Sequence, residues 1–247
     1  MLFYKEKQMN KNKLAIFGFP RSATKLLASI YEQQGYHNFG EFFSATTYLN
    51  NNSVPNAIRL SRPEQMQMKQ KESELTRWSS NFEQFKFLSN RISSFKNYKN
   101  IPEKSIVTFW MHNVSVSPEL LSQFDDRYVL LPRRSNKFEQ LLSRMLVLSH
   151  FNQDGEVPSS PITINLKTSD KFEFAVYQMS RTYALQDHFI SQGRGCVIDF
   201  DELITGRADL GFEYTVTSDD QHTDFSSLVT NLSEVREAFE KLEKIYF

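Results

Sequence analysis

The sequence predicts an α/β fold of three layers, in which helices cover both faces of a mainly parallel sheet. Two observations lead to this prediction. Short apolar runs without alternation recur along the 247 residues, as expected for strands that are covered on both faces. Segments with apolar residues at helical spacing lie between or after these runs, and such alternation favours parallel strands joined by helices. We find no internal repeat and therefore expect one domain over residues 1–247.

The expected elements follow one another in a simple order. Leu14–Phe19 is the first strand, Thr24–Gln34 is the first helix, and a second strand ends near Glu41. The remaining strands are expected at four apolar runs: Ile106–Trp110, Tyr128–Leu131, Ile162–Leu166 and Cys196–Phe200. The remaining helices are expected to begin at four positions: Ser117, Ser135 (as far as about His150), Ser169 or Asp170 (as far as Gly193), and Ser233 (as far as Tyr246). Residues 61–99 form a charged helical stretch without a strand signal, which we interpret as a helical insertion into the domain.

The composition narrows the class of protein. With 29 Lys and Arg residues against 29 Asp and Glu residues the net charge is zero, so we expect no nucleic-acid partner, which would require a basic excess. Cys196 is the only cysteine, which excludes an internal disulfide and a metal site with several cysteine ligands. No apolar run is long enough to span a membrane, and residues 1–13 are polar and lack a signal-peptide core. We therefore expect a cytoplasmic protein without a membrane span, and the oligomeric state stays open.

The segment between the first strand and the first helix has the composition of an anion-binding loop. It reads FGFPRSATKLL over residues 17–27, without the G-x-x-x-x-G-K-S/T spacing that indicates Mg-ATP. A tight turn here directs backbone N–H groups and the positive end of the helix dipole to one point. Ser22 and Thr24 add hydroxyl groups, while Arg21 and Lys25 add positive charges. The alternative is an ordinary basic helix N-terminus, but cations at that end of a helix oppose its dipole.

This loop resembles the P-R-S-G-S/T-T-L-L loop of sulfotransferases that use 3′-phosphoadenosine-5′-phosphosulfate (PAPS), in which the loop holds the 5′-phosphosulfate end of the donor. The resemblance implies that this end is bound by Arg21, Ser22, Ala23, Thr24 and Lys25. Two of these residues depart from the family pattern. Ala23 replaces a glycine, so we expect the turn to avoid a left-handed backbone. Lys25 replaces a threonine and supplies an ammonium group that could clamp the transferred sulfuryl group.

A second segment follows the strand expected at Tyr128–Leu131 and enters a helix. It carries Arg133 and Arg134 at the strand end, where open α/β sheets bind ligands, and Ser143 two turns into the helix. The segment resembles the R-R-N/D-x-L/F-x-Q-x-V/I-S pattern of bacterial sugar and lipopolysaccharide sulfotransferases, whose first Arg and Ser hold the 3′-phosphate of the donor. Aligned on the serine, the resemblance implies that Arg134 and Ser143 bind that phosphate, and Ser135 takes the place of the second Arg. The alternative is a pair of arginines in surface ion pairs and a serine without a special role.

Two residues compete for the role of general base. Glu41 ends the second strand, which we expect beside the first, where the bacterial sugar sulfotransferases have P-x-E-Y/F-F/L; here Gly40 precedes it and the proline is absent. An alcohol that attacks sulfur must lose a proton, and a carboxylate among aromatic residues has a raised pKa suited to accept it. His112 follows another apolar run, comparable to a histidine that cytosolic sulfotransferases often use. An exposed loop glutamate and a core or loop histidine are the plainer alternatives.

Together the resemblances imply a P-loop NTPase-like fold and a PAPS-dependent sulfotransferase over about residues 13–204, including a late segment (residues 195–203) similar to the v-x-Y-E-D-L strand of the family. The expected reaction transfers a sulfuryl group from PAPS to a hydroxyl of a small-molecule or carbohydrate acceptor, without a metal. The implied catalytic residues are Glu41 or His112, together with Lys25. Two other classes stay open: a small-molecule or nucleotide kinase of similar architecture, and a catalytically inactive relative that binds nucleotides.

Overall fold

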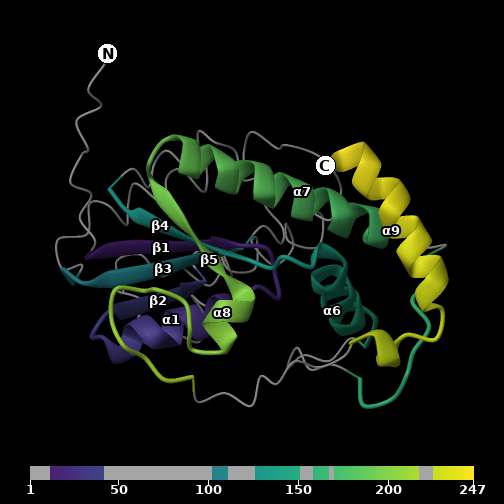
Figure 1. Ribbon diagram of the computed structural model, residues 1–247, viewed down its shortest axis with the longest axis horizontal. Coiled ribbons are helices and arrows are strands. Elements are labelled where there is room, and N and C mark those ends of the chain that lie inside the picture. The colour runs from purple at the N-terminus through teal and green to yellow at the C-terminus, as the bar shows by residue number, and fades with distance from the viewer. Residues whose placement is uncertain (1–11, 42–101, 111–125, 151–157, 167–169, 217–224) are drawn as a thin grey trace, which may run out of the picture.

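The computed structural model describes residues 12–41, 102–110, 126–150, 158–166, 170–216 and 225–247 (Figure 1). These residues form a five-stranded sheet in the order β2-β3-β1-β4-β5. Every pair of neighbouring strands in it is parallel. The strand bounds are Lys13–Gly18 (β1), His37–Glu41 (β2), Ser105–Trp110 (β3), Tyr128–Arg133 (β4) and Gly195–Asp199 (β5). The predicted α/β fold with a mainly parallel sheet is confirmed.

Helices cover both faces of this sheet. Their bounds are Thr24–Gln33 (α1), Lys137–His150 (α6), Asp170–Ser191 (α7), Phe200–Ile204 (α8) and Leu232–Tyr246 (α9), with a short 3-10 helix at Phe225–Leu228 (η2). Because successive side chains of a strand point to opposite faces, Leu14 and Ile16 of β1 share a core with α1. The ring of Phe17 instead lies edge-on to that of Phe189 in α7, with 6.0 Å between the ring centroids. Figure 1 shows α1 and α7 on opposite sides of the sheet, as three layers require.

A second core lies between α6, α7 and α9. Its buried members include Leu142, Met179 and Phe239, one from each helix, and also Ile164. The prediction of a strand at Ile162–Leu166 is therefore wrong. Within that segment the structure has an isolated parallel bridge between Ile162 and Val229, because the apolar side chains pack among helices and not within the sheet.

Two further expectations need correction. β2 does not lie beside β1: it pairs with β3 at the edge of the sheet, and β3 separates it from β1. β5 ends at Asp199 and not at Phe200, because the Asp199 carboxylate accepts hydrogen bonds from the N–H groups of Asp201 and Glu202 (2.8 and 3.0 Å) and so caps α8.

Some expected features lie outside the described residues. These are the insertion over residues 61–99 and the helix from Ser117. Among the helices that the structure describes, none has the length and apolar character needed to cross a membrane.

The strand order places the carboxyl ends of β1 and β4 side by side. β1 lies at the centre of the sheet, paired with β3 on one side and with β4 on the other. The chain leaves β1 for β2 and β3 on one side and then continues to β4 on the other, so the connections diverge between β1 and β4. In open α/β sheets ligands bind at such a point, outside the carboxyl ends of the strands. The loops that follow β1 and β4 contain both segments singled out from the sequence.

A buried arginine joins β1, β3 and β4 at their amino ends, opposite the ends where the candidate loops lie. Arg127, directly before β4, is 1% exposed and donates to the carbonyl oxygens of Leu14 and Ser105 (2.9 and 3.3 Å) and to Ser105 Oγ (3.2 Å). Burial lowers the pKa of Arg127 to about 10, so it still carries its charge at neutral pH. We expect Arg127→Met to lower the free energy of unfolding, measured by urea denaturation, by about 2–3 kcal/mol, because buried acceptors lose their donor.

Lys13→Met is the matched control for this substitution. It removes an ion pair between Lys13 and Asp126 (3.2 Å), whose side chains are 35% and 38% exposed. Such exposed pairs contribute less than about 1 kcal/mol. Equal losses of stability in the two variants would contradict the structural role of Arg127.

Candidate functional site

The loop between β1 and α1 packs tightly against the end of the sheet. The Ser22 hydroxyl is fully buried and donates to the carbonyl oxygen of Phe19 (2.7 Å). A Cβ on Gly18 would lie 2.6 Å from Ser22 Oγ and 3.0 Å from Pro132 Cγ, so a larger residue here would displace the Ser22 hydroxyl. The hydroxyl proton of Ser22 therefore stabilises the loop and is not available to an anion, contrary to the expectation from the sequence. Ser22 would contact a ligand through its backbone N–H group. Thr24 is buried at the start of α1, and Lys25 is exposed on the same turn.

Two residues of this loop adopt a left-handed backbone: Arg21, with φ 69°, and Ala23, with φ 59° and ψ 30°. The expectation that alanine keeps the turn out of this region is wrong. Ala23 directly precedes α1, and its carbonyl oxygen accepts the hydrogen bond from Leu27 N–H (2.9 Å) that starts the helix. A residue with a side chain loses about 1–2 kcal/mol in this conformation. Such strain persists where neighbouring contacts hold the backbone, and it is typical of functional loops.

Arg21 connects this loop to α6. Its Nε donates to Ser143 Oγ at 2.9 Å, across 122 residues of sequence. The Ser143 side chain is buried, and after accepting this bond its hydroxyl still has a proton to donate. The structure therefore brings into contact two residues that the sequence places in separate motifs.

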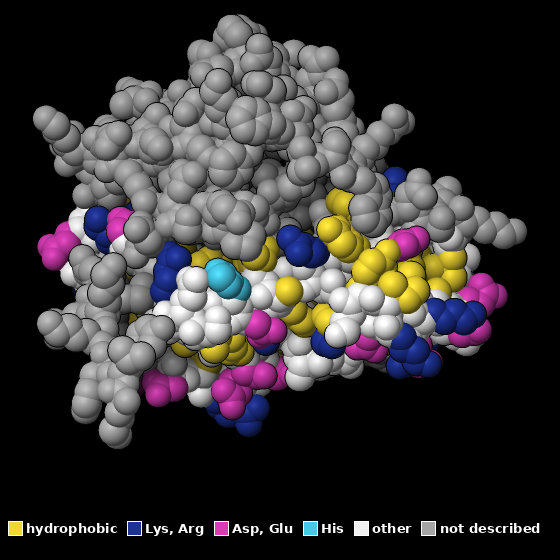
Figure 2. All heavy atoms as spheres, turned by 90° about the horizontal axis from the view of Figure 1, so that it is seen from above, with side chains coloured by type: hydrophobic (Ala, Val, Ile, Leu, Met, Phe, Trp, Pro, Cys, Tyr) yellow, Lys and Arg dark blue, Asp and Glu magenta, His cyan; other side chains and the backbone are white. Residues whose placement is uncertain are grey.

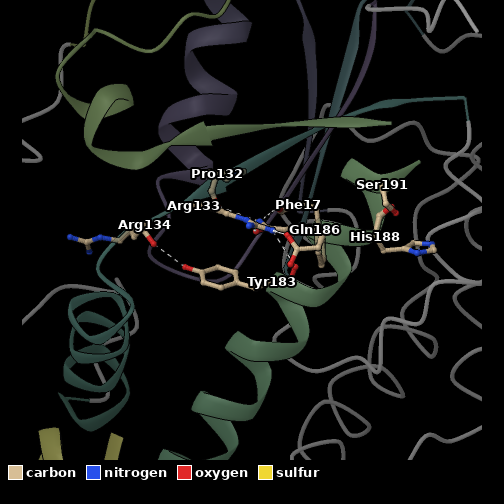
Figure 3. Close-up of polar contacts among 9 residues, drawn as sticks. Phe17, Pro132, Arg133, Arg134, Tyr183, Gln186, His188 and Ser191 are labelled. Atoms are coloured by element: carbon tan, nitrogen blue, oxygen red, sulfur yellow. Dashed lines mark hydrogen bonds and ion pairs between the residues drawn. The ribbon is translucent and has the colours of Figure 1, made fainter. Parts of the chain in front are cut away.

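The adjacent arginines at the end of β4 point in opposite directions (Figure 3), as the alternation of an extended chain requires. Arg133 lies against α7, where its Nε donates to Gln186 Oε1 (2.6 Å) and its Nη2 forms an ion pair with Asp187. Its Nη2 also donates to the carbonyl oxygen of Tyr183 (3.2 Å). The hydrogen bonds and the ion pair of Arg133 thus join α7 to the end of β4.

Arg134 occupies a buried position on the other side. Its guanidinium carbon lies 4.1 Å from the centroid of the Phe200 ring, and its Nη2 lies 3.3 Å from Glu139 Oε2. Burial lowers the pKa of Arg134, the nearby charge of Arg21 lowers it further, and Glu139 and Asp201 act in the opposite direction. In this structure Glu139 therefore holds the guanidinium that the sequence assigns to a phosphate.

Arg144 is a third arginine near the loop, and the sequence motifs do not include it. Gln140, Ser143 and Arg144 lie on one face of α6, because residues three and four apart in a helix are neighbours. Gln140 Nε2 donates to the carbonyl oxygen of Pro20 (3.3 Å), which places this face against the loop. Burial and the charge of Arg21 lower the pKa of Arg144 to about 10. The helical spacing from Gln140 is the signal in the sequence that could have identified it.

Glu41 lies at the carboxyl end of the edge strand β2. Since β3 separates β2 from β1, two strand spacings place the Glu41 backbone roughly 10 Å from β1. Gly40 has φ 69°, and the register of β2 against β3 shifts between Asn38 and Glu41. Glycine suits this irregularity, which accounts for Gly40 where the family pattern differs. The rival base, His112, lies outside the described residues.

The positive charge that the described residues bring to the loop between β1 and α1 comes from a few nearby side chains and not from a broad basic surface (Figure 2). Among the coloured side chains in Figure 2, which belong to described residues, basic and acidic groups are interspersed and form no broad patch of one sign. Within the part of the chain that the structure describes, Arg21, Lys25, Arg134 and Arg144 bring positive charge to the surroundings of the loop. No group of three His, Cys, Asp or Glu side chains within the described ranges could hold a metal ion. The arrangement suits a small, multiply charged anion better than a long polyanion.

No protein-family model matches this chain, and no curated protein matches it. The likeness to sulfotransferases therefore rests on short segments of the sequence. What these segments can do chemically has to be argued from the residues that the fold brings together.

Arg144 provides a test of the charge at this site. The pKa of Arg144 lies below the ordinary value of arginine, so its protonated form is disfavoured in the folded state relative to the unfolded state. The resulting loss of folding free energy is complete at neutral pH. It diminishes only when the pH rises above about 10 and the guanidinium loses its proton. In urea denaturation at neutral pH we expect Arg144→Met to lower the free energy of unfolding less than Arg127→Met does, because the charge of Arg21 disfavours that of Arg144 while Asp126 favours that of Arg127. The same variant should gain less stability from added sulfate than the unmodified protein.

Arg181→Met, at an exposed position of α7, is the control and should change neither quantity. A loss of stability in Arg144→Met as large as that in Arg127→Met, with the response to sulfate unchanged, would show that Arg144 is an ordinary structural residue.

Proposed function

We propose that this chain is a sulfotransferase that moves a sulfuryl group from PAPS to a hydroxyl group of a small-molecule or carbohydrate acceptor. The observation that carries this proposal is the hydrogen bond between Arg21 and Ser143 at 2.9 Å. It joins the two segments that resemble the donor-binding motifs at the neighbouring ends of β1 and β4, although 122 residues separate them in the sequence. A ligand with two anionic groups would contact both segments at this place.

The described residues offer partners for both ends of such a donor. Arg21, Lys25 and the N–H groups of the first turn of α1 would bind the 5′-phosphosulfate. Ser143 and Arg134 would bind the 3′-phosphate. Arg21 would lie between the two groups, since its guanidinium already contacts Ser143. Arg134 would share its guanidinium between Glu139 and the phosphate, which the five N–H donors of an arginine allow.

In the proposed reaction the acceptor oxygen bonds to sulfur while the bond between sulfur and the 5′-phosphate oxygen breaks. The hydroxyl proton passes to a general base, and adenosine-3′,5′-bisphosphate leaves. Negative charge grows on the leaving oxygen, where Arg21 and Lys25 would stabilise it. The transferred sulfuryl group carries less charge than a phosphoryl group, so side-chain cations and N–H groups can provide this stabilisation.

Calorimetry with two nucleotides tests the proposal. Adenosine-3′,5′-bisphosphate should bind at least about tenfold more tightly than AMP, because a charge-assisted contact to the second phosphate contributes on the order of 1.5–3 kcal/mol. Ser143→Ala should remove much of this preference. Ser191→Ala, at an exposed position at the end of α7, is the control and should leave it intact.

Two results would contradict the proposal. Tighter binding of Mg-ATP than of the bisphosphate would indicate the kinase alternative. Equal affinity for AMP and the bisphosphate would remove the basis for a PAPS site.

The base is tested separately from the donor. Glu41→Gln should abolish turnover and change the dissociation constant of adenosine-3′,5′-bisphosphate by less than about twofold, because a base acts in the transition state and not on the bound product. Turnover is measured with PAPS and a panel of hydroxyl acceptors. If His112→Asn abolishes turnover and Glu41→Gln does not, the role belongs to His112.

A further inference from the structure

Two buried glutamines donate hydrogen bonds to backbone carbonyl groups at the ends of β1 and β4 and in the loop between β1 and α1, which is the anion-binding loop of the proposed function. Gln186 of α7 donates from Nε2 to the carbonyl oxygens of Phe17 (2.9 Å) and Pro132 (3.4 Å), the ends of β1 and β4. Gln140 of α6 donates from Nε2 to the carbonyl oxygen of Pro20 (3.3 Å). Both glutamine side chains are fully buried. The peptide groups on either side of the turn are therefore fixed by side chains that lie far away in the sequence.

Each glutamine is oriented by a hydrogen bond that its Oε1 accepts. Arg133 Nε donates to Gln186 Oε1 (2.6 Å), and an arginine has no acceptor atom. The Tyr183 hydroxyl donates to Gln140 Oε1 (2.7 Å) and lies 3.2 Å from the carbonyl oxygen of Arg134. Burial raises the pKa of Tyr183 to about 12, so the hydroxyl keeps its proton at neutral pH. Figure 3 shows Tyr183 and Gln186 reaching from α7 to the ends of the two strands.

The chain of hydrogen bonds through Tyr183 and Gln140 ends at the peptide group that precedes Arg21. In a trans peptide the C=O and N–H groups point in opposite directions. Because Gln140 holds the Pro20 carbonyl on the α6 side, the N–H of Arg21 is turned to the other side of the loop. Arg21 itself has a left-handed backbone, which a peptide without this restraint would tend to leave.

We propose that Tyr183 and Gln140 are positioning residues for the anion-binding loop. Their hydrogen bonds fix the peptide plane between Pro20 and Arg21 and, through it, the direction in which Arg21 approaches Ser143. The same hydroxyl lies 3.2 Å from the carbonyl oxygen of Arg134, but its one proton is donated to Gln140, so the restraint acts on the loop after β1. This inference rests on the proposed function for the identity of the ligand, but the restraint itself does not depend on that identity.

Tyr183→Phe tests the restraint, because it removes a single hydroxyl and keeps the ring. We expect amide hydrogen exchange in the peptide spanning residues 19–26 to become about tenfold faster. The dissociation constant of adenosine-3′,5′-bisphosphate should rise about three- to tenfold, as for the loss of one buried hydrogen bond. Gln140→Met should produce both effects, and adding Tyr183→Phe to it should change little more, because both substitutions break the same connection.

Tyr246→Phe is the matched control. The Tyr246 hydroxyl donates to Glu173 (2.6 Å) at the other end of α7, so this variant also loses one tyrosine hydrogen bond. It should leave exchange of residues 19–26 and nucleotide affinity unchanged, although the urea midpoint can fall. This control separates positioning of the loop from a general loss of stability.

The outcomes distinguish the two proposals. If the unmodified protein does not bind the bisphosphate, the proposed function fails, and the exchange measurement still decides the positioning role. Unchanged loop exchange in both Tyr183→Phe and Gln140→Met would overturn the positioning role. Equal acceleration in Tyr183→Phe and Tyr246→Phe would overturn it as well.

Discussion

The central position of β1 is the constraint on which the rest of the described structure depends. Its backbone N–H and C=O groups are hydrogen-bonded to β3 on one side and to β4 on the other, and its side chains are buried on both faces of the sheet. The strand must therefore be a continuous apolar run, and the first place where the chain can expose polar groups is the loop after Gly18. That loop lies beside the end of β4 because β4 pairs directly with β1. The candidate site follows from this pairing, since both of its segments begin where these two strands end.

Much of the fold could be predicted because the strands of this sheet are short apolar runs, including the partly exposed edge strand β5. The four strands expected around residues 14–19, 106–110, 128–131 and 196–200 are present, with ends displaced by one or two residues. The segment Ile162–Leu166 has the same apolar signature but packs among helices, and apolar periodicity alone does not distinguish these two environments. The place of β2 could not be predicted either, because sequence order does not reveal that β3 inserts between β1 and β2.

The site was predictable in its residue types and not in its contacts. The sequence places Arg21 and Ser143 on the right kinds of element, but the hydrogen bond between them depends on how α6 packs against the loop. Alternation predicts that Arg133 and Arg134 point in opposite directions. It does not predict that Arg133 binds Gln186, which lies 53 residues further along the chain. Nor does it predict that Arg134 pairs with Glu139 only five residues away, because that contact depends on how α6 is oriented after β4. Arg144 has the helical spacing from Gln140 that the sequence shows, but it was missed because the sequence does not show that this face of α6 packs against the loop.

The candidate site also retains features that lower the stability of the folded chain. Arg21 and Ala23 have left-handed backbones, and the charge of Arg21 lowers the pKa of both Arg134 and Arg144. Residues that repel one another or are strained are expected where a ligand relieves the cost. An anion bound beside Arg21 would offset the repulsion among these cations. Ala23, where the sulfotransferase motif that the loop resembles has a glycine, fits the same view, because alanine here adds strain without preventing the left-handed turn. The departure from the motif at Ala23 is therefore compatible with anion binding, because the backbone conformation that a glycine would provide is still formed.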